Sequence, residues 1–343
     1  MVKDNKRKEK KGKYKRGAAV GFLSLMVFMM FSGCNYKTEK KKEPEQKETE
    51  QKASILMAVG EETVSLEEAG IYAYFLKHQY EDSMGKVIWD YKLEGKTFET
   101  YAKEEIQNLL IQIKILKQEA KKQEILLTED EQEEARACGV DYLGNVSKED
   151  KKTYGLTLES LTRIYGENIL ANKMFEISTN DVNTNISDDE VKQITIQYIM
   201  VMTKGMDQNN IRVNMTEEEK KKAKSKAKKL WKEAKETTDF LSLAESNTDA
   251  KDAEIAFSKK DAPEDLKETV FQLKNGELSP LIEGENGYYI VYCVNDDDED
   301  ATAQKKEELI EERQRASFEK KFAKWSGEYE IVSSTTLWNK IKL

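Results

Sequence analysis

The hydrophobic pattern of this chain changes its period near residue 190, and this change limits the folds that the chain can adopt. Before that point apolar residues recur at helical spacing, as in the stripe Ile106, Leu109, Leu110, Ile113, Leu116 and Ala120. After it come runs of branched and aromatic residues, Thr195–Met202 and Tyr288–Val294, which are typical of strands. The sequence therefore predicts an α+β fold with a helical part followed by a small antiparallel sheet.

Capping patterns divide the helical part. Ser65 with Glu68 and Thr128 with Glu131 have the spacing of a capping box, in which each side chain bonds the other residue's backbone N–H. We therefore expect residues 60–180 to form an all-helical unit.

The second part has a different order of predicted elements. After the strand over Thr195–Met202 and a loop to Asn214, three helices are expected over Thr216–Lys235, Phe240–Ser246 and Leu266–Leu273, and then strands over Leu278–Ile282 and Tyr288–Val294. The lysine-rich first helix could form a patch for anionic ligands. Its glutamates at i±4 favour a solvated amphipathic helix instead.

An acidic run follows the last of these strands. Asn295–Asp300 and Ser187–Asp189 are polar stretches that we interpret as hinges on either side of the second part. A final helix is expected over residues 302–325, then a strand over Tyr329–Val332 and an apolar anchor at Leu337, Trp338 and Ile341.

The N-terminus has the pattern of a secretory signal. Nine Lys/Arg and two acidic residues precede Gly17, an apolar run extends to Phe31, and Ser32-Gly33-Cys34 follows. The apolar run is shorter than the roughly 20 residues that a spanning helix needs. Ser32-Gly33-Cys34 resembles a bacterial lipobox, which implies lipidation at Cys34 and an anchor on the extracytoplasmic face of a cell membrane. The alternative is an ordinary cleaved signal with a chance cysteine.

The predicted mature chain is acidic and begins with a spacer. Residues 34–54 carry no aliphatic side chain larger than alanine, so we expect a disordered tether there. The leader carries a net charge of +7, so its removal takes the net charge from −9 to −16. This acidity argues against nucleic-acid binding.

Cysteine and histidine are scarce. Besides Cys34 there are two cysteines, Cys138 and Cys293, which either form a disulfide or are buried small side chains. One histidine, His78, rules out histidine-based metal clusters, and no metal or cofactor is expected.

Residues 194–295 resemble a parvulin-type peptidyl-prolyl isomerase domain. Phe240–Ala244 is similar to the F-x-x-L-A helix of that family, Phe271–Pro280 to its F-x-L-x-x-G-E-x-S-P turn, and Gly287–Val291 to its last strand. The flanking helices resemble the chaperone domain of SurA-like and PrsA-type foldases, in which N-terminal helices and a C-terminal segment fold around an inserted isomerase domain.

The resemblance implies five segments. They are a signal peptide (1–33), the tether (34–54), the N-terminal part of a chaperone domain (55–187), a parvulin-like domain (188–297) and a C-terminal helix and tail that pack on the chaperone domain (298–343).

The catalytic positions depart from the family. Tyr198 stands where parvulins have a histidine on the first strand, and Tyr289 replaces the histidine of the last strand. Asp249 matches the family's acidic or cysteine position. We predict that the two tyrosines lie side by side near Asp249, although they could equally be core aromatics that form a cross-strand pair.

The same resemblance implies a proline pocket lined by Phe257, Ala262, Leu266 and Phe271, with Ala262 and Leu266 at the family's methionine and phenylalanine positions. A methionine reduced to alanine would widen the pocket.

Three functions remain open at this point. The first is a chaperone that holds unfolded exported polypeptides, with a degenerate isomerase site, which the 15 tyrosines favour. The second is an active isomerase with a Tyr/Tyr/Asp site, and the third is a structural spacer without clients. A homodimer is left open, and the lack of a doubly wound α/β alternation argues against a solute-binding protein.

Overall fold

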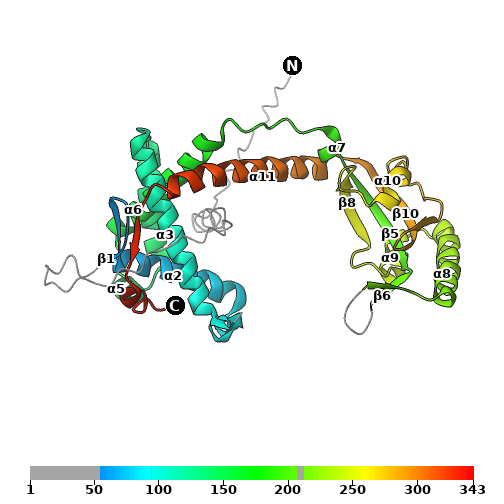
Figure 1. Ribbon diagram of the computed structural model, residues 1–343, viewed down its shortest axis with the longest axis horizontal. Helices are drawn as coiled ribbons and strands as arrows, with labels where there is room; N and C mark the ends of the chain where they lie inside the picture. The colour runs from blue at the N-terminus through cyan, green and yellow to red at the C-terminus, as the bar shows by residue number, and fades with distance from the viewer. Residues whose placement is uncertain (1–54, 94, 207–211) are drawn as a thin grey trace, which may run out of the picture. The chain divides into compact units, whose positions relative to one another are not determined.

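The computed structural model describes residues 55–93, 95–206 and 212–343, which divide into two compact units (Figure 1). The first unit comprises the described residues up to Asp181 together with Arg315–Leu343, and the second comprises Val182–Gln314. The second unit is longer at both ends than the segment 188–297 expected from the sequence. The predicted signal, Cys34 and the tether lie outside the described residues.

The first unit is mostly helical, with short strands at both ends of its sequence and a two-stranded hairpin within residues 92–97. The expectation of an all-helical unit over residues 60–180 was therefore wrong at these short strands. The elements of the first unit before the second unit are β1 (Ile55–Val59), β2 (Glu62–Ser65), α2 (Leu66–Met84), the 3-10 helix η2 (Lys86–Asp90), β3 (Lys92–Leu93), β4 (Lys96–Thr97), α3 (Phe98–Lys122), α4 (Glu129–Asn145), α5 (Lys148–Thr153) and α6 (Leu158–Thr179). Its elements after the second unit are the end of α11 (Glu299–Ser326), β11 (Ile331–Ser333) and α12 (Thr335–Trp338).

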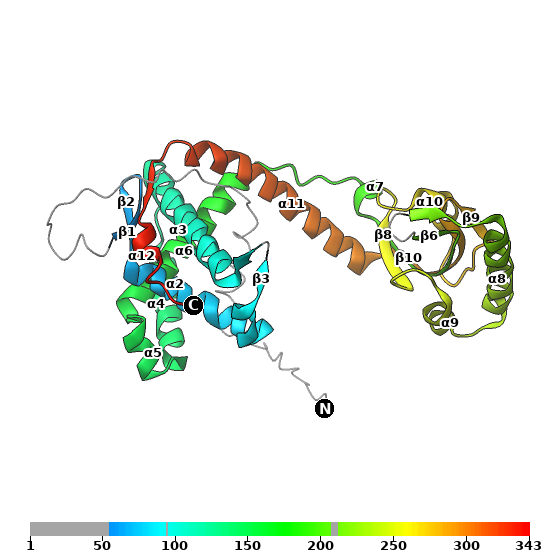
Figure 2. The same ribbon diagram turned by 60° about the horizontal axis from the view of Figure 1, so that its bottom comes forward.

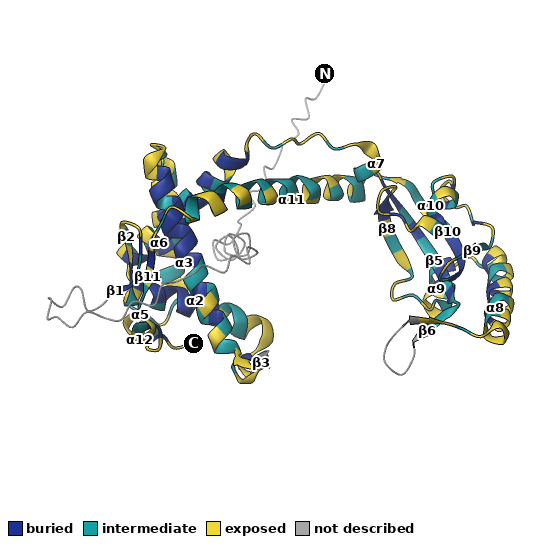
Figure 3. Ribbon diagram, in the orientation of Figure 1, coloured by how far each residue is buried: buried dark blue, intermediate teal, exposed yellow. Residues whose placement is uncertain are grey.

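Helix α3 is the centre of the first unit. All residues from Leu109 to Leu116 are buried, including Gln112 and Lys114, so neighbours cover every side of this helix (Figure 3). The apolar stripe predicted from the sequence is therefore part of a wider buried surface. A polar side chain in this stretch needs a partner inside the protein.

The C-terminal segment completes the first unit. Strand β11 pairs antiparallel with β1, and the sheet has the order β11-β1-β2 (Figure 2). Trp338 and Ile341 are buried in the same core.

The second unit is built on a four-stranded antiparallel sheet. Its elements are α7 (Asp188–Val191), β5 (Gln193–Met202), β6 (Lys204–Met206), β7 (Arg212–Asn214), α8 (Glu217–Glu236), α9 (Phe240–Asn247), β8 (Glu254–Ser258), α10 (Glu264–Val270), β9 (Ile282–Gly284), β10 (Gly287–Asp298) and the start of α11. The strand order is β8-β5-β10-β9, so β5 and β10 are central.

Helices cover both faces of this sheet. Ala227 and Leu230 of α8 and Phe240 of α9 pack on one face, and Leu266 and Val270 of α10 pack on the other. The lysines of α8 lie on its exposed side (Figure 3), as expected for a solvated amphipathic helix.

The strand predictions for the second unit were wrong in three places. The segment Leu278–Ile282 makes one isolated bridge, between Leu278 and Tyr292, and the regular strand β9 begins at its last residue. Pro280 has no N–H to donate to a strand ladder, which disfavours a strand there. Strand β8 was not predicted, and the expected loop before Asn214 contains the hairpin strands β6 and β7.

The acidic run does not form a loop. Strand β10 ends at Asp298 and helix α11 begins at Glu299, so the predicted hinge is regular structure. Asp298 accepts hydrogen bonds from the Ala301 N–H at 3.0 Å and from the Thr195 hydroxyl at 2.6 Å. Acidic side chains stabilise a helix N-terminus, which accounts for the run.

Three further observations concern the described part of the chain. No helix there combines the length and the apolarity that crossing a membrane requires. No group of three or more His, Cys, Asp or Glu residues there has the arrangement of a metal site. Cys138 and Cys293 are free thiols in different units, and Cys293 is the buried one.

Candidate functional site

One apolar face of the sheet in the second unit gathers most of the predicted site residues. Its buried cluster contains Tyr289 of β10, Phe257 of β8 and Leu266 of α10, and Tyr198 of β5 packs against it. The face arises because side chains alternate along a strand, so that even-numbered residues of β5 and odd-numbered residues of β10 point the same way. We call this cluster the sheet-face site.

The two tyrosines lie on neighbouring central strands but are not directly opposite each other. In the register of β5 and β10, Tyr198 is opposite Val291 and Tyr289 is opposite Met200. The tyrosines are therefore diagonal neighbours, a relation that places residues roughly 7–8 Å apart and within reach of aromatic side chains. Tyr289 is buried, whereas Tyr198 is half-buried.

The four predicted pocket residues belong to the same cluster. Phe257, Ala262 and Leu266 are buried, and the half-buried Phe271 packs against them. The rings of Phe257 and Phe271 have their centroids 6.0 Å apart. These residues give the site an apolar wall from β8 and from the segment around α10.

Asp249 is not among the residues of this cluster. Its carboxylate accepts a hydrogen bond from the Met202 N–H at 2.9 Å and lies 3.4 Å from the Lys226 Nζ of α8. Its own N–H donates to the Met200 carbonyl at 2.8 Å. Asp249 therefore bonds the backbone of β5 along the edge that β8 no longer covers, since the β8 pairing ends at Gln197.

The Tyr198 phenol is a hydrogen-bond donor at neutral pH. Burial raises its pKa, and the negative charge of Asp252 raises it further. A neutral phenol can donate one hydrogen bond to a peptide carbonyl. Peptide-bond rotation faces a barrier of about 18–20 kcal/mol, and an apolar surface with a few hydrogen-bond donors is the kind of site that could bind the rotating bond.

The sequence did not indicate every side chain of the site. Met200, Ile255 and Ile282 also pack against the cluster, and Cys293 is buried within it. Once the strand register is known, alternation alone identifies Met200 and Cys293, because they follow Tyr198 and Tyr289 at even spacing. Ile255 could not be found in this way, because β8 was not predicted.

The glycine that begins β10 is required by a close backbone approach. Gly287 has a φ of +158°, and a Cβ there would collide with the carbonyl oxygen of Val201 on β5. Gly287 lies two residues before Tyr289 and lets the start of β10 approach β5 closely. The pairing of these two strands sets the register of Tyr198 and Tyr289.

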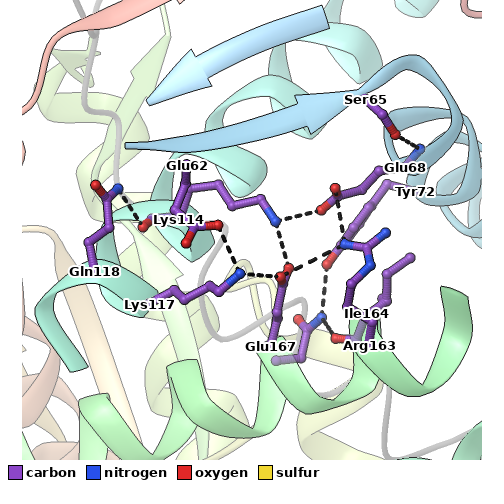
Figure 4. Close-up of polar contacts among 11 residues, drawn as sticks. Glu62, Ser65, Glu68, Tyr72, Lys114, Lys117, Gln118, Arg163, Ile164 and Glu167 are labelled. Atoms are coloured by element: carbon purple, nitrogen blue, oxygen red, sulfur yellow. Dashed lines mark hydrogen bonds and ion pairs between the residues drawn. The ribbon is translucent and has the colours of Figure 1, made fainter. Parts of the chain in front are cut away.

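A buried charge cluster lies in the first unit (Figure 4). The Lys114 Nζ is 2.8 Å from Oε1 of Glu68 and 2.7 Å from Oε2 of Glu167, and these side chains are only 1%, 4% and 7% exposed. Arg163 Nη1 lies 3.1 Å from Glu68, and Lys117 Nζ lies 3.1 Å from Glu167. The cluster therefore joins α2, α3 and α6 through ion pairs.

The role of Glu68 differs from the sequence prediction. Ser65 caps α2 by accepting from the Glu68 N–H at 3.0 Å, as expected. The Glu68 carboxylate, however, points to Lys114 and Arg163 and is buried (Figure 4). The capping pattern gave the correct helix start but could not indicate a partner 46 residues away in the sequence.

Electrostatics favour the charged form of Glu167. Burial alone would raise the pKa of Glu167, but the ion pairs with Lys114 and Lys117 outweigh burial and hold its pKa below the usual range. Lys117 also bonds Glu62 at 2.8 Å, so the charges extend from the interior to the surface.

Comparison with known proteins places both parts of the chain in context. Residues 206–298 match the PPIC-type PPIASE domain family, a range that includes Tyr289 and Asp249 but begins after Tyr198. The foldase protein PrsA of Caldanaerobacter subterraneus is 27% identical over 218 residues, which cover 60% of this chain and 61% of that protein. The foldase protein PrsA of Clostridium tetani is 24% identical over 330 residues, which cover 90% of this chain and 93% of that protein.

Similarity to solved structures is low overall. A crystal structure of the peptidylprolyl isomerase PrsA from Bacillus cereus covers 78% of this chain and 88% of that chain, with 15% identity and a TM-score of 0.33. The match to the first of the two curated relatives spans less than two thirds of that protein's length.

Proposed function

Since this chain is PrsA-like and carries a PPIC-type domain, we propose that it is an extracytoplasmic foldase that binds unfolded, newly exported polypeptides. In this proposal Cys34 carries a lipid that anchors the protein to the outer face of the cell membrane, and residues 34–54 are the tether. The first unit supplies the chaperone surface, and the second supplies a parvulin-like site.

We further propose that the isomerase site is degenerate and that chaperone activity dominates. The observation that carries this proposal is the composition of the sheet-face site, where Tyr198 and Tyr289 occupy the positions at which the family resemblance implies histidines. The Asp249 carboxylate is engaged by the Met202 N–H and by Lys226 of α8, a helix that packs on the opposite face of the sheet.

An apolar surface with one half-buried phenol suits binding better than rapid catalysis. Phe257, Leu266 and Phe271 can contact an apolar segment such as a proline, and the Tyr198 phenol can donate to a backbone carbonyl. Ala262 is smaller than the methionine expected at its position, so the grip on a proline ring is looser.

The test compares two activities of the full chain. Suppression of the aggregation of an unfolded client should be clear, whereas a proline-limited refolding reaction should be accelerated only slightly. Uncatalysed isomerisation takes tens to hundreds of seconds, so even modest catalysis is measurable. The variant that removes both phenols of the site is Tyr198→Phe/Tyr289→Phe. Its matched control is Tyr292→Phe, because Tyr292 lies on β10 like Tyr289 but packs on the opposite face of the sheet.

The alternative function is a fully active isomerase with a Tyr/Tyr/Asp site. It would be favoured by strong acceleration of refolding that the double variant Tyr198→Phe/Tyr289→Phe abolishes and Tyr292→Phe retains. The observation that favours this alternative is that Tyr198 is half-buried and not enclosed in the core as Tyr289 is.

A further inference from the structure

A cavity lies beside the buried charge cluster in the first unit. Its volume is about 330 Å³, and its walls come from α3, α4, α6 and the segment before α4. This volume is at the low end of the range for ligand pockets, about 300–1,000 Å³, and suits one or two side chains. The sheet-face site is in the other unit, so the cavity is a separate feature.

Part of the cavity wall is apolar. Leu127, Ala135 and Leu170 line it, and Gly166 of α6 lies among them. A Cβ at Gly166 would be 3.5 Å from Cδ1 of Leu127 and 3.9 Å from Cβ of Ala135, which are ordinary contacts. A larger residue would therefore fit at this helical position, and glycine leaves the space open at the expense of helix propensity.

The contrast with Gly139 of α4 supports this interpretation. A Cβ at Gly139 would be 3.3 Å from Leu158 and 3.4 Å from Leu161, so tight packing of α4 on α6 accounts for that glycine. Packing gives no such reason for Gly166.

The charged part of the wall presents cations to solvent. The side chains of Arg163 and Lys117 are 43% and 36% exposed, whereas that of Glu167 is 7% exposed. Arg163 contacts Glu68 at 3.1 Å and Glu167 at 3.8 Å through Nη1, and the exposed part of its side chain faces solvent. Arginine binds carboxylates through paired N–H donors.

A third observation concerns the chain beside the cavity. Leu126, which precedes the lining residue Leu127, is 74% exposed and is the most exposed large hydrophobic residue in the described ranges. An apolar ligand that continues past the cavity would cover it. An extended polypeptide can do both, because one of its side chains can fill the cavity while the next residues along its backbone cover Leu126.

We propose that this cavity binds one leucine-sized side chain of an unfolded polypeptide, and that an acidic residue next to it in that polypeptide pairs with Arg163 and Lys117. The proposal rests on the proposed foldase function and specifies a class of client segment. It predicts a preference for apolar-acidic sequences over apolar-basic ones.

The experiment measures the binding of fluorescent peptides to the full chain by anisotropy. The peptides have a Gly/Ser background with a central Leu-Asp, Leu-Lys or Ala-Asp pair. Leu-Asp should bind about 10-fold or more tightly than Ala-Asp, because a leucine side chain is buried. It should bind about 2- to 5-fold more tightly than Leu-Lys, as expected for partly exposed ion pairs.

The variant Gly166→Leu fills the cavity from a helical position and should weaken binding of the Leu-Asp peptide about 10-fold. Gly144→Leu on α4 is the matched control, because a Cβ there meets nothing within 4 Å and the residue does not line the cavity. Circular dichroism and the melting temperature of each variant show whether the fold is kept. If Gly166→Leu unfolds the protein, Gly166→Ala is used, with a smaller expected loss of about 2- to 3-fold.

Two results would overturn the proposal while leaving the foldase function intact. One is equal peptide binding by wild type and a folded Gly166 variant, and the other is no discrimination among the three peptides, in each case with suppression of client aggregation retained. Loss of aggregation suppression in the wild-type chain would instead overturn the foldase proposal itself.

Discussion

Replacement of Lys114 by methionine tests whether the buried charge cluster holds the first unit together. Methionine keeps most of the volume of the side chain but leaves the carboxylates of Glu68 and Glu167 without their shared partner. Removal of one member of a buried ion pair costs about 3–5 kcal/mol. Glu68 keeps Arg163 at 3.1 Å and Glu167 keeps Lys117 at 3.1 Å, so we expect the lower end, about 3 kcal/mol.

Chemical denaturation followed by tryptophan fluorescence measures this loss. Trp89, Trp325 and Trp338 belong to the first unit and Trp231 to the second, so a Trp231→Phe background makes the signal specific. In a thermal melt, each kcal/mol lowers the melting temperature of a domain of this size by about 2–4 °C. A loss of about 3 kcal/mol should therefore lower the melting temperature of this unit by about 6–12 °C.

A matched control uses a lysine of the same helix. Lys121 pairs with Glu61 at 3.8 Å, and the two side chains are 80% and 87% exposed. Lys121→Met should change the free energy of unfolding by no more than about 0.5 kcal/mol. Equal effects of Lys114→Met and Lys121→Met would refute the reasoning, as would a double-mutant cycle of Lys114→Met with Glu68→Gln that shows no coupling.

Three other predictions concern separate parts of the chain. Gly287→Ala should destabilise the second unit by about 1–3 kcal/mol, because its Cβ would collide with the carbonyl oxygen of Val201. The control Gly205→Ala, whose Cβ meets nothing within 4 Å, should leave the stability unchanged, and thermal melts of the two variants test this. Because the pKa of Glu167 is lowered in the folded state, its stabilising contribution is complete above its unfolded pKa of about 4.3 and is lost as the pH falls through the folded pKa. Denaturation series from about pH 6 to about pH 3 should therefore show a loss of stability that Glu167→Gln reduces, and an unchanged pH profile in that variant would contradict the assignment. Metabolic labelling with a clickable fatty acid should mark the wild-type protein and not Cys34→Ala, and equal labelling of both would exclude lipidation at Cys34.

Local signals in the sequence predicted much of the secondary structure. Thr97 and Thr128 cap α3 and α4, and the runs of branched residues became the central strands β5 and β10. These elements were predictable because caps and periodicity depend on residues a few positions apart. Strand β8 has a weaker signal in the sequence. Only its last two residues, Phe257 and Ser258, are buried, so apolar and polar residues do not alternate along it.

The predicted site was harder to derive from the sequence because it depends on register. Similarity to a family motif indicated Tyr198 and Tyr289, but their diagonal relation follows from the pairing of β5 with β10. The environment of Asp249 depends on Met202 and Lys226, which lie far from it in the sequence. The cavity beside Arg163 likewise requires three helices to be packed before it exists.

The pairing of β11 with β1 has a consequence for the order of folding. Synthesis from the N-terminus delivers Ile55–Val59 long before Ile331–Ser333, the segment with which it pairs. The second unit, Val182–Gln314, is continuous in sequence and can fold as soon as it has emerged. The first unit must wait for the last residues of the chain, so a truncated product would carry a folded isomerase-like unit and an incomplete first unit.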